Sequence, residues 1–224
     1  MPELPEVETT IRGLRPVLEG QTLALVEPRR PDLRFAFPAD LRQRLTGARV
    51  IGLGRRAKYG LIGTDRGDTM IFHLGMSGRW RVDPEEIGTH DHLVLETAEG
   101  RRLSLNDPRR FGSVDMFRTD ELAAYPAFVA LGPEPLGPDF TAGYLARAIE
   151  GRSAPIKALL LDQRIVAGLG NIYVCEALHM AGIAPTRPGG RIATKRIEAL
   201  VPAIRQVLEA AIEAGGSTLR DYAR

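Results

Sequence analysis

The chain has 224 residues, 44% of them hydrophobic, which suffices for one large domain or two modest ones with hydrophobic cores. Its formal net charge is +2 and its pI is near 8.9, so the chain is only mildly basic. It has no charged tail of the kind that binds a polyanion. A single cysteine, Cys175, excludes an internal disulfide and a multi-cysteine metal site in this chain, and its apolar neighbours predict a buried thiol. Because no stretch resembles a signal peptide or a membrane span, we expect a soluble cytoplasmic protein.

The N-terminus combines a potential nucleophile with an acidic neighbour. Removal of Met1 would leave Pro2 as a secondary amine, which can add to an aldehyde or a sugar C1 and form an iminium. An α-amino group titrates near ~7.7–8.0, so an appreciable fraction of it is unprotonated and nucleophilic at neutral pH. The adjacent Glu3 could move protons around a reacting sugar.

A helix is predicted to begin directly after this amine. Pro5 suits a first helical position, and apolar residues follow at helical spacing at Val7, Ile11, Leu14 and Leu18. The positive end of the helix dipole would disfavour the protonated amine. Taken alone, the segment is more typical of an ordinary amphipathic helix with an acidic first turn, so the nucleophile hypothesis depends on the rest of the chain.

Seven apolar runs of strand length follow the opening helix and predict a β-rich first half. They are Thr22–Val26, Arg49–Leu53, Tyr59–Ile62, Met70–Leu74, His92–Glu96, Arg102–Leu105 and Val114–Phe117. Gly, Pro, Asp or Asn bounds most of them, and their spacing suggests an antiparallel sandwich or a flattened barrel. A short helix at Ala39–Leu45 is compatible with the pattern.

Three stretches between these runs carry polar or exposed groups that suggest function. Arg55–Tyr59 places three cations beside an aromatic residue, which suits phosphate contact, although a solvated basic edge strand fits nearly as well. Met76 stands between two glycines and could be an exposed wedge for a base stack rather than core. His90 and His92 flank Asp91, a pattern that suggests metal, but structural hydrogen bonding is favoured because no further ligands follow close by.

The stretch Asn106–Gly112 is the most informative of the interior. A proline and a glycine bracket a rigid turn, from which the guanidiniums of Arg109 and Arg110 and the ring of Phe111 project. An arginine can fill the space left by an extruded base, and a phenylalanine can wedge open the neighbouring step.

A stretch rich in proline and glycine divides the chain. Residues 132–138 hold three prolines and two glycines, and we predict a hinge there between domains at 1–131 and 139–224. Helical spacing then predicts helices near 144–149, at 156–160, at 172–181 and from Thr194 onward. Pro202 falls inside the last helix, where we expect a kink or a restart.

A glycine-rich turn, Gly168–Gly170, opens one of these helices and leads into Asn171 and Tyr173. Free backbone N–H groups at such a turn form a phosphate seat, to which the two side chains would add donors. A plain joint between two helices is the alternative. Lys157 could reach a nucleic-acid backbone, although a solvated surface lysine fits about as well.

Five motifs occur along the chain in the order found in a known family. They are PELPEVET at the start, RRAKY at 55–59, HLGMSG at 73–78, DPRRFG at 107–112 and GLGNIY at 168–173. Together they resemble formamidopyrimidine-DNA glycosylase, a bacterial base-excision family that removes oxidised purines and then nicks the abasic strand by β,δ-elimination. The resemblance covers residues 1–224. It implies an α+β fold, with a leading helix and a β-sandwich followed by a helical domain that carries a helix-two-turn-helix motif.

The resemblance also assigns roles to residues. It implies Pro2 as the nucleophile and Glu3 as the general acid–base, and Lys58 is a third catalytic candidate. Lys58 and His73 are implied to lie near the phosphates. It implies that Met76, Arg109 and Phe111 fill the void left by the extruded purine. It also implies that Arg109 contacts the orphan cytosine. The full set of DNA-binding candidates is His73, Met76, His92, Arg109, Arg110, Phe111, Lys157, Asn171 and Tyr173. Gly215–Leu219 begins what is, in the family, a mobile loop over the flipped base.

The implied partner is damaged double-stranded DNA, bound in a cleft between the domains by a monomeric protein associated with the nucleoid. No cofactor is expected in this chain, and zinc is expected only if the four-cysteine finger of the family follows residue 224. Two alternatives stay open. One is an endonuclease VIII-like enzyme for oxidised pyrimidines, against which Leu4 argues because that relative usually has glycine there. The other is a DNA-binding module without catalysis.

Overall fold

The computed structural model describes residues 2–216, which divide into two compact units. Within the described residues, the first unit comprises Pro2 and Glu6–Tyr125, and the second comprises Glu3–Pro5 and residues 126–216. The boundary therefore falls before the predicted hinge at 132–138, which lies inside the second unit. Two backbone hydrogen bonds connect that segment to its own unit, from Gly132 N–H to Gln163 O (2.8 Å) and from Ala167 N–H to Pro133 O (3.0 Å).

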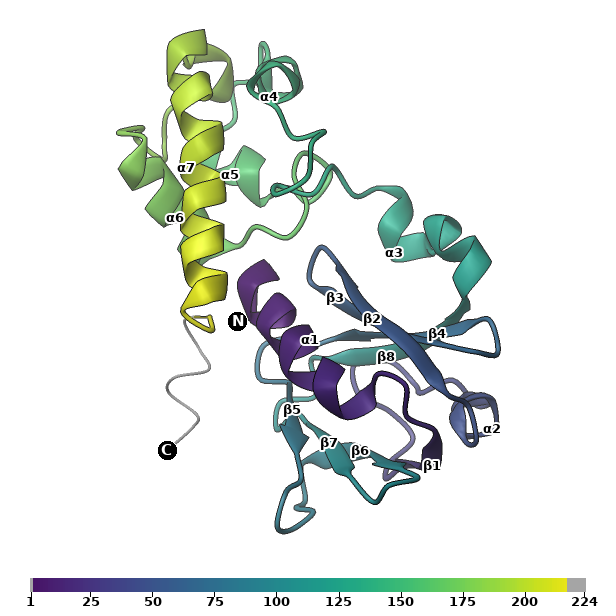
Figure 1. The fold of residues 1–224 in the computed structure, drawn as a ribbon. Helices are drawn as coiled ribbons and strands as arrows, with labels where there is room; N and C mark the ends of the chain where they lie inside the picture. The colour runs from purple at the N-terminus through teal and green to yellow at the C-terminus, as the bar shows by residue number, and fades with distance from the viewer. Residues whose placement is uncertain (1, 217–224) are drawn as a thin grey trace. The chain divides into compact units, whose positions relative to one another are not determined.

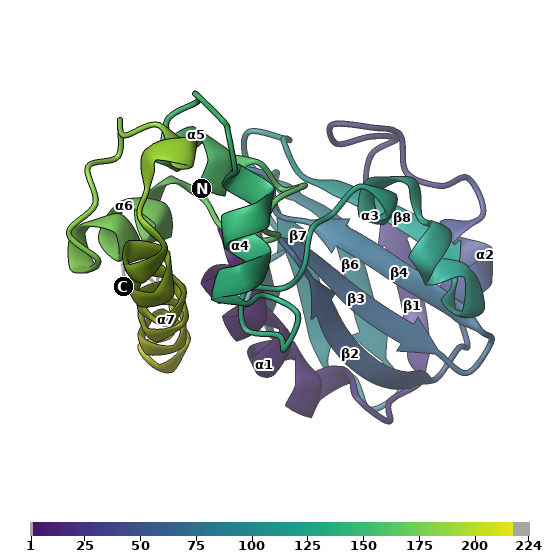
Figure 2. The ribbon, with the colours of Figure 1, turned by 90° about the horizontal axis from the view of Figure 1, so that it is seen from above.

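The first unit is a sandwich of two antiparallel sheets of four strands each (Figure 1). One sheet has the order β1-β6-β7-β5, with β1 at Leu23–Pro28, β6 at Asp91–Thr97, β7 at Arg102–Asn106 and β5 at Arg79–Val82. The other has the order β2-β3-β4-β8, with β2 at Val50–Arg56, β3 at Tyr59–Thr64, β4 at Asp68–His73 and β8 at Ser113–Arg118. Seen from above, the second sheet lies across the first (Figure 2). The predicted sandwich is confirmed.

Strand β5 is the strand that the sequence pattern missed. It has only four residues, two of them arginines, so it shows no apolar run. Its place at the edge of a sheet explains that composition, because an edge strand is half solvated and tolerates charged side chains. The short helix predicted near Ala39–Leu45 forms α2 at Leu41–Leu45.

The leading helix α1 spans Leu4–Leu18 and starts one residue before Pro5, the predicted first helical position. Its apolar stripe, Val7, Ile11, Leu14 and Leu18, is at most 2% exposed and belongs to the hydrophobic core of the sandwich. Burying a side chain of this size contributes about 1.5–3 kcal/mol each. The stripe therefore fixes the helix against the sandwich, and Pro2 and Glu3 stand at its N-terminal end.

The second unit is helical and encloses its own core (Figure 1). Its helices are α3 at Pro126–Val129, α4 at Ala142–Ile149, α5 at Ile156–Leu161, α6 at Asn171–Met180 and α7 at Thr194–Glu213. Two 3-10 helices, η1 at Thr119–Ala124 in the first unit and η2 at Gly189–Arg191 in the second, were not predicted. Helix α7 runs unbroken through Pro202, so of the two alternatives expected there, a kink or a restart, the restart is excluded.

Two further sequence expectations concern single segments. Cys175 is half-buried rather than buried, so the prediction from its apolar neighbours overstated its enclosure. The predicted loop at Gly215–Leu219 lies mostly outside the described residues, which end at Gly216. Within the described part of the chain, no helix is both long and apolar enough to cross a membrane.

Candidate functional site

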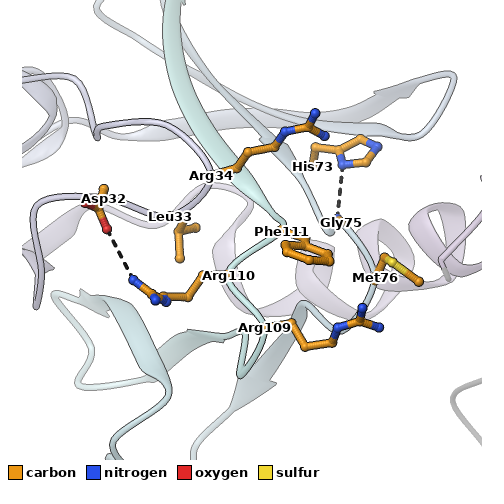
Figure 3. Close-up of a pocket in the computed structure, with 9 residues that line it drawn as sticks. All are labelled: Asp32, Leu33, Arg34, His73, Gly75, Met76, Arg109, Arg110 and Phe111. Carbon is orange, nitrogen blue, oxygen red and sulfur yellow. Dashed lines mark hydrogen bonds and ion pairs between the residues drawn. The ribbon is translucent and has the colours of Figure 1, made fainter.

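A pocket of about 650 Å³ opens in the first unit (Figure 3). Three short segments line it, and they contribute Asp32, Leu33, Arg34, His73, Gly75, Met76, Arg109, Arg110 and Phe111. Figure 3 shows Arg34 beside His73 and Arg109 beside Phe111. The pocket thus gathers cationic, aromatic and thioether side chains from motifs that lie far apart in the sequence.

Strand pairing explains why these motifs meet. In the β3–β4 ladder Tyr59 pairs with His73, and their rings lie 4.9 Å apart. In the β4–β8 ladder His73 pairs with Ser113, so the turn that precedes β8 lies beside the end of β4. Lys58, in the two-residue turn between β2 and β3, is next to Tyr59 in the chain. One end of one sheet therefore carries the RRAKY, HLGMSG and DPRRFG motifs.

The buried carboxylate of Asp107 ties two of these turns together. Asp107 is 0% exposed; its Oδ1 accepts from the Ser77 hydroxyl (2.6 Å), and its Oδ2 accepts from Gly112 N–H (2.8 Å). The Ser77 hydroxyl oxygen in turn accepts from Arg109 N–H (3.2 Å). Because the pairing is complete on both carboxylate oxygens, the turn that carries Met76 and the turn that carries Arg109 form one rigid support.

Close backbone packing between the same turns requires glycine at position 75. Gly75 has φ +61°, and a Cβ there would overlap the carbonyl carbon of Phe111. With the backbones in contact, the side chains of Met76 and Phe111 project outward and are 43% and 45% exposed. The Arg109 guanidinium lies 4.8 Å from the centre of the Phe111 ring. Large apolar groups held in the open in this way are suited to insertion into a base stack.

Arg110 leaves the same turn in a different direction. Its backbone adopts the left-handed region at φ +55°, which is uncommon for a residue with a side chain. Its guanidinium lies 3.8 Å from the Asp32 carboxylate, on the other side of the pocket from Arg109 (Figure 3). The two arginines of the motif are therefore not equivalent, and Arg109 is the one beside the exposed apolar pair.

His73 is held as a neutral hydrogen-bond donor. Its Nδ1 accepts a hydrogen bond from Gly75 N–H (3.0 Å), which leaves the ring proton on Nε2. Burial, followed by the nearby charges of Lys58 and Arg34, lowers the pKa of His73 from 6.5 to about 4. At neutral pH the ring therefore offers an N–H donor flanked by two cations, an arrangement that suits a phosphate oxygen.

His92 is one of the DNA-binding candidates whose side chains are buried, and it is 4% exposed. Its Nε2 lies 3.0 Å from the backbone oxygen of Asp107, and burial lowers its pKa, so the ring supports the Asp107 turn from inside. The favoured structural interpretation of the histidine pair agrees with this placement. Among the described residues, no cluster of His, Cys, Asp or Glu is arranged to hold a metal ion.

In the second unit the glycine turn before α6 holds Glu3. Glu3 is 1% exposed, and its Oε1 accepts a hydrogen bond from Ile172 N–H (3.0 Å) in the first turn of α6. The next residue, Leu4, donates its N–H to Gly168 O (3.1 Å). A Cβ at position 170 would overlap the Glu3 carboxyl carbon, so a larger residue there would displace that carboxyl group. Pro2, which precedes Glu3, is half-buried.

The remaining candidates of this unit differ in exposure. Asn171, the first residue of α6, is exposed, whereas Tyr173 is 2% exposed and belongs to the helical core. Lys157, in the first turn of α5, is half-buried. Of the two side chains predicted to add donors to the glycine turn, only that of Asn171 is at the surface.

Arg34 is a pocket residue that the sequence interpretation missed. It stands in an irregular segment after β1, where its N–H donates to Gly112 O (3.0 Å) and its guanidinium lies 5.5 Å from the centre of the Phe35 ring. A signal was present, because Arg30–Phe35 combines arginines and an aromatic residue beside a proline, as the DPRRFG motif does. Phe35 is 64% exposed.

Two family models match most of the chain. The formamidopyrimidine-DNA glycosylase N-terminal domain matches residues 1–114, and the formamidopyrimidine-DNA glycosylase H2TH domain matches residues 131–223. A curated relative, the formamidopyrimidine-DNA glycosylase of Rhizorhabdus wittichii, is 77% identical over 224 residues, which are 100% of this chain and 83% of that protein.

Solved structures agree with these matches. The crystal structure of the MutM (Fpg) protein from Thermus thermophilus has a TM-score of 0.87 and 40% identity over 98% of this chain and 79% of that one. A Lactococcus lactis Fpg mutant in complex with a Fapy-dG containing DNA has a TM-score of 0.92 and 35% identity over 99% and 82%. Sequence and fold thus lead to one conclusion: the chain belongs to the formamidopyrimidine-DNA glycosylase family, whose members are DNA-repair enzymes for oxidised purines.

Proposed function

We propose that Pro2 is the nucleophile and Glu3 the general acid–base of a bifunctional glycosylase and AP lyase. The observation that carries this proposal is the placement of Glu3, a carboxyl side chain that is 1% exposed and accepts a hydrogen bond at the start of α6. A helix N-terminus stabilises a carboxylate through its free N–H groups and its dipole. An acid–base group fixed directly beside an N-terminal secondary amine suits chemistry at a sugar carbon.

The chemistry follows from these two groups. The lone pair of the Pro2 nitrogen forms a bond to C1′, and the base departs with the electron pair of the glycosidic bond and with the proton that the Pro2 nitrogen loses. Glu3 donates a proton to O4′ as the C1′–O4′ bond breaks, and departure of the base requires this ring opening, which leaves an iminium between Pro2 and C1′. The iminium acidifies the C2′ hydrogen, whose loss expels the 3′ phosphate. Loss of the C4′ hydrogen then expels the 5′ phosphate, and water releases the enzyme.

The pocket of the first unit supplies the groups that would hold an opened duplex. Met76, Phe111 and Arg109 fill the void left by the extruded purine, and the Arg109 guanidinium reads the orphan cytosine. His73 donates to a phosphate from its neutral ring, with Lys58 supplying positive charge nearby.

Four other candidates complete the proposed interface. Asn171 offers an exposed side chain at the start of α6, Lys157 adds a cation, and Arg110 lines the pocket. His92 contributes indirectly by supporting the Asp107 turn. Tyr173 would act mainly by packing α6, because its ring is in the core.

Family membership favours oxidised purines as the substrate. A Lactococcus lactis relative with the same fold was crystallised with a Fapy-dG containing DNA, from which we transfer the formamidopyrimidine class, and the resemblance to the family adds 8-oxoguanine. An enzyme for oxidised pyrimidines and a non-catalytic DNA-binding module are the competing functions. Each makes a different prediction about excision.

A duplex excision assay tests the proposal. The chain, after confirmation by mass that Met1 is removed, should release 8-oxoguanine opposite cytosine and nick the strand. Glu3→Gln should abolish release of the base, and Pro2→Gly should abolish both steps. Release of oxidised pyrimidines in preference to 8-oxoguanine would support the first competing function, and binding without release would support the second.

A further inference from the structure

Gln163 lies beside the glycine turn that holds Glu3, and its side chain bonds to both sides of that turn. Its Oε1 accepts a hydrogen bond from Gly168 N–H (2.8 Å), and its Nε2 donates to Leu169 O (2.9 Å). The same Nε2 also donates to Leu161 O (3.1 Å), at the end of α5. The partners define the amide orientation, because the reverse orientation would set a donor against an N–H and an acceptor against two carbonyls.

The bonded turn is the one that touches Glu3. Gly168 receives the Gln163 side chain on its N–H, and its carbonyl oxygen accepts from the N–H of Leu4, the residue after Glu3. Gly170 lies so close to the Glu3 carboxyl carbon that a side chain added there would displace the carboxyl group. One side chain thus connects, through two residues of the turn, to the backbone and the carboxyl group of the proposed acid–base.

The Gly168–Gly170 turn must keep one backbone conformation if it is to hold Glu3 in place. Residues 168–170 are buried, and a buried backbone group that loses its hydrogen-bond partner destabilises the fold. The Gln163 amide satisfies two such groups in the turn and is itself fixed by its backbone oxygen, which accepts from Gly132 N–H (2.8 Å). A side chain bound at both ends restricts the turn more than either hydrogen bond would alone.

We propose that Gln163 is a positioning residue for base excision, which acts by fixing the Gly168–Gly170 turn and through it the carboxyl group of Glu3. This inference rests on the proposed role of Glu3. It assigns to Gln163 no contact with the substrate. The effect of removing it should therefore appear in the step that needs Glu3 and not in the reaction of Pro2 with an aldehyde.

Two substrates separate these steps. On an 8-oxoguanine duplex the glycosidic bond must break and the sugar ring must be opened with the help of Glu3. On a preformed abasic site the base is already gone and the open aldehyde forms in water, so borohydride trapping reports the Pro2 amine alone. Gln163→Met, close in shape but without hydrogen bonds, should slow single-turnover excision roughly 10- to 100-fold, because a displacement of about 1 Å can cost about 100-fold. Trapping on the abasic site should stay at the wild-type level.

A double mutant and a neighbour control complete the design. In a Glu3→Gln background Gln163→Met should cause no further loss of excision, since its effect operates through Glu3. Arg164→Gln is the matched control, because the Arg164 side chain pairs with Asp162 at the surface and should leave both reactions unchanged. If thermal melting shows that Gln163→Met does not fold, Gln163→Asn takes its place, since the shorter amide cannot reach Gly168 and Leu169 together.

The outcomes are distinct. Selective loss of excision without a further loss in the double mutant supports the proposal. Equal loss of excision and trapping, an additive loss in the double mutant, or no loss at all overturns it. If the wild-type chain fails to trap an abasic site, or if Glu3→Gln leaves excision intact, the proposed function fails instead.

Discussion

The neutral state of His73 leads to a prediction about stability and pH. The pKa of His73 is lowered from 6.5 to about 4 in the folded protein, first by burial and then by the charges of Lys58 and Arg34. In the unfolded chain the ring takes up a proton near its ordinary pKa, whereas in the folded protein it does not until a much lower pH. The favourable contribution is therefore present above pH 6.5 and is lost as the pH falls towards 4.

The magnitude follows from linkage. One pKa unit corresponds to about 1.4 kcal/mol, so the full difference is about 3 kcal/mol, and about 2 kcal/mol of it should be lost between about pH 7 and about pH 5. His73→Asn provides the comparison, because the Asn side-chain oxygen can accept from Gly75 N–H and cannot be protonated in this range. The variant should lose about 2 kcal/mol less than the wild type over the same interval.

Urea denaturation followed by tryptophan fluorescence measures this difference. Trp80 is the only tryptophan of the chain and packs against Phe72 in the first unit, with ring centres 5.6 Å apart, so its emission reports the unfolding of the unit that contains His73. A histidine NMR titration adds a direct reading of the His73 pKa, which Lys58→Met should raise. Titration of His73 at its ordinary pKa, or equal losses of stability in wild type and His73→Asn, would refute the reasoning.

Two further predictions concern the turns that line the pocket. Arg109→Ala should narrow the preference for cytosine over adenine opposite 8-oxoguanine by roughly 1–3 kcal/mol, the discrimination expected of one bidentate base contact, as measured by excision from the two duplexes. Arg110→Ala is its control, and the assignment is reversed if that variant alone relaxes the preference. Ser77→Ala removes the hydroxyl between Asp107 and Arg109, and should lower the free energy of unfolding by about 1–3 kcal/mol, with Ser77→Thr close to wild type. Equal urea midpoints for all three proteins would show that the Asp107 connection contributes nothing.

The sandwich and the leading helix could be predicted because their signals are local. The seven apolar runs and the stripe from Val7 to Leu18 reflect burial on one face, and each corresponds to an element of the fold. Strand β5 escaped because its stability comes from pairing with β7, which no four-residue composition reveals. Each pocket motif could likewise be recognised in the sequence. Their proximity in the fold could not, because it depends on the pairing of Tyr59 and Ser113 with His73.

Helical spacing explains why one predicted DNA-binding residue of α6 is exposed and the other is buried. Asn171 and Tyr173 are two residues apart, and residues at that spacing point in different directions on a helix. One can therefore meet solvent while the other enters the core, as their exposures show. Gln163 gave no signal at all, since a single amide between charged residues is typical of any surface turn. Its partners are backbone atoms, which a sequence does not distinguish.

The central claim is that the Pro2 nitrogen forms the covalent intermediate. Borohydride reduction of the chain on a duplex that contains 8-oxoguanine opposite cytosine, followed by digestion and peptide mass mapping, measures this directly. We expect one adduct, on an N-terminal peptide that begins with Pro2, and its loss in Pro2→Gly. An adduct that maps to Lys58, or an undiminished adduct in Pro2→Gly, would contradict this claim.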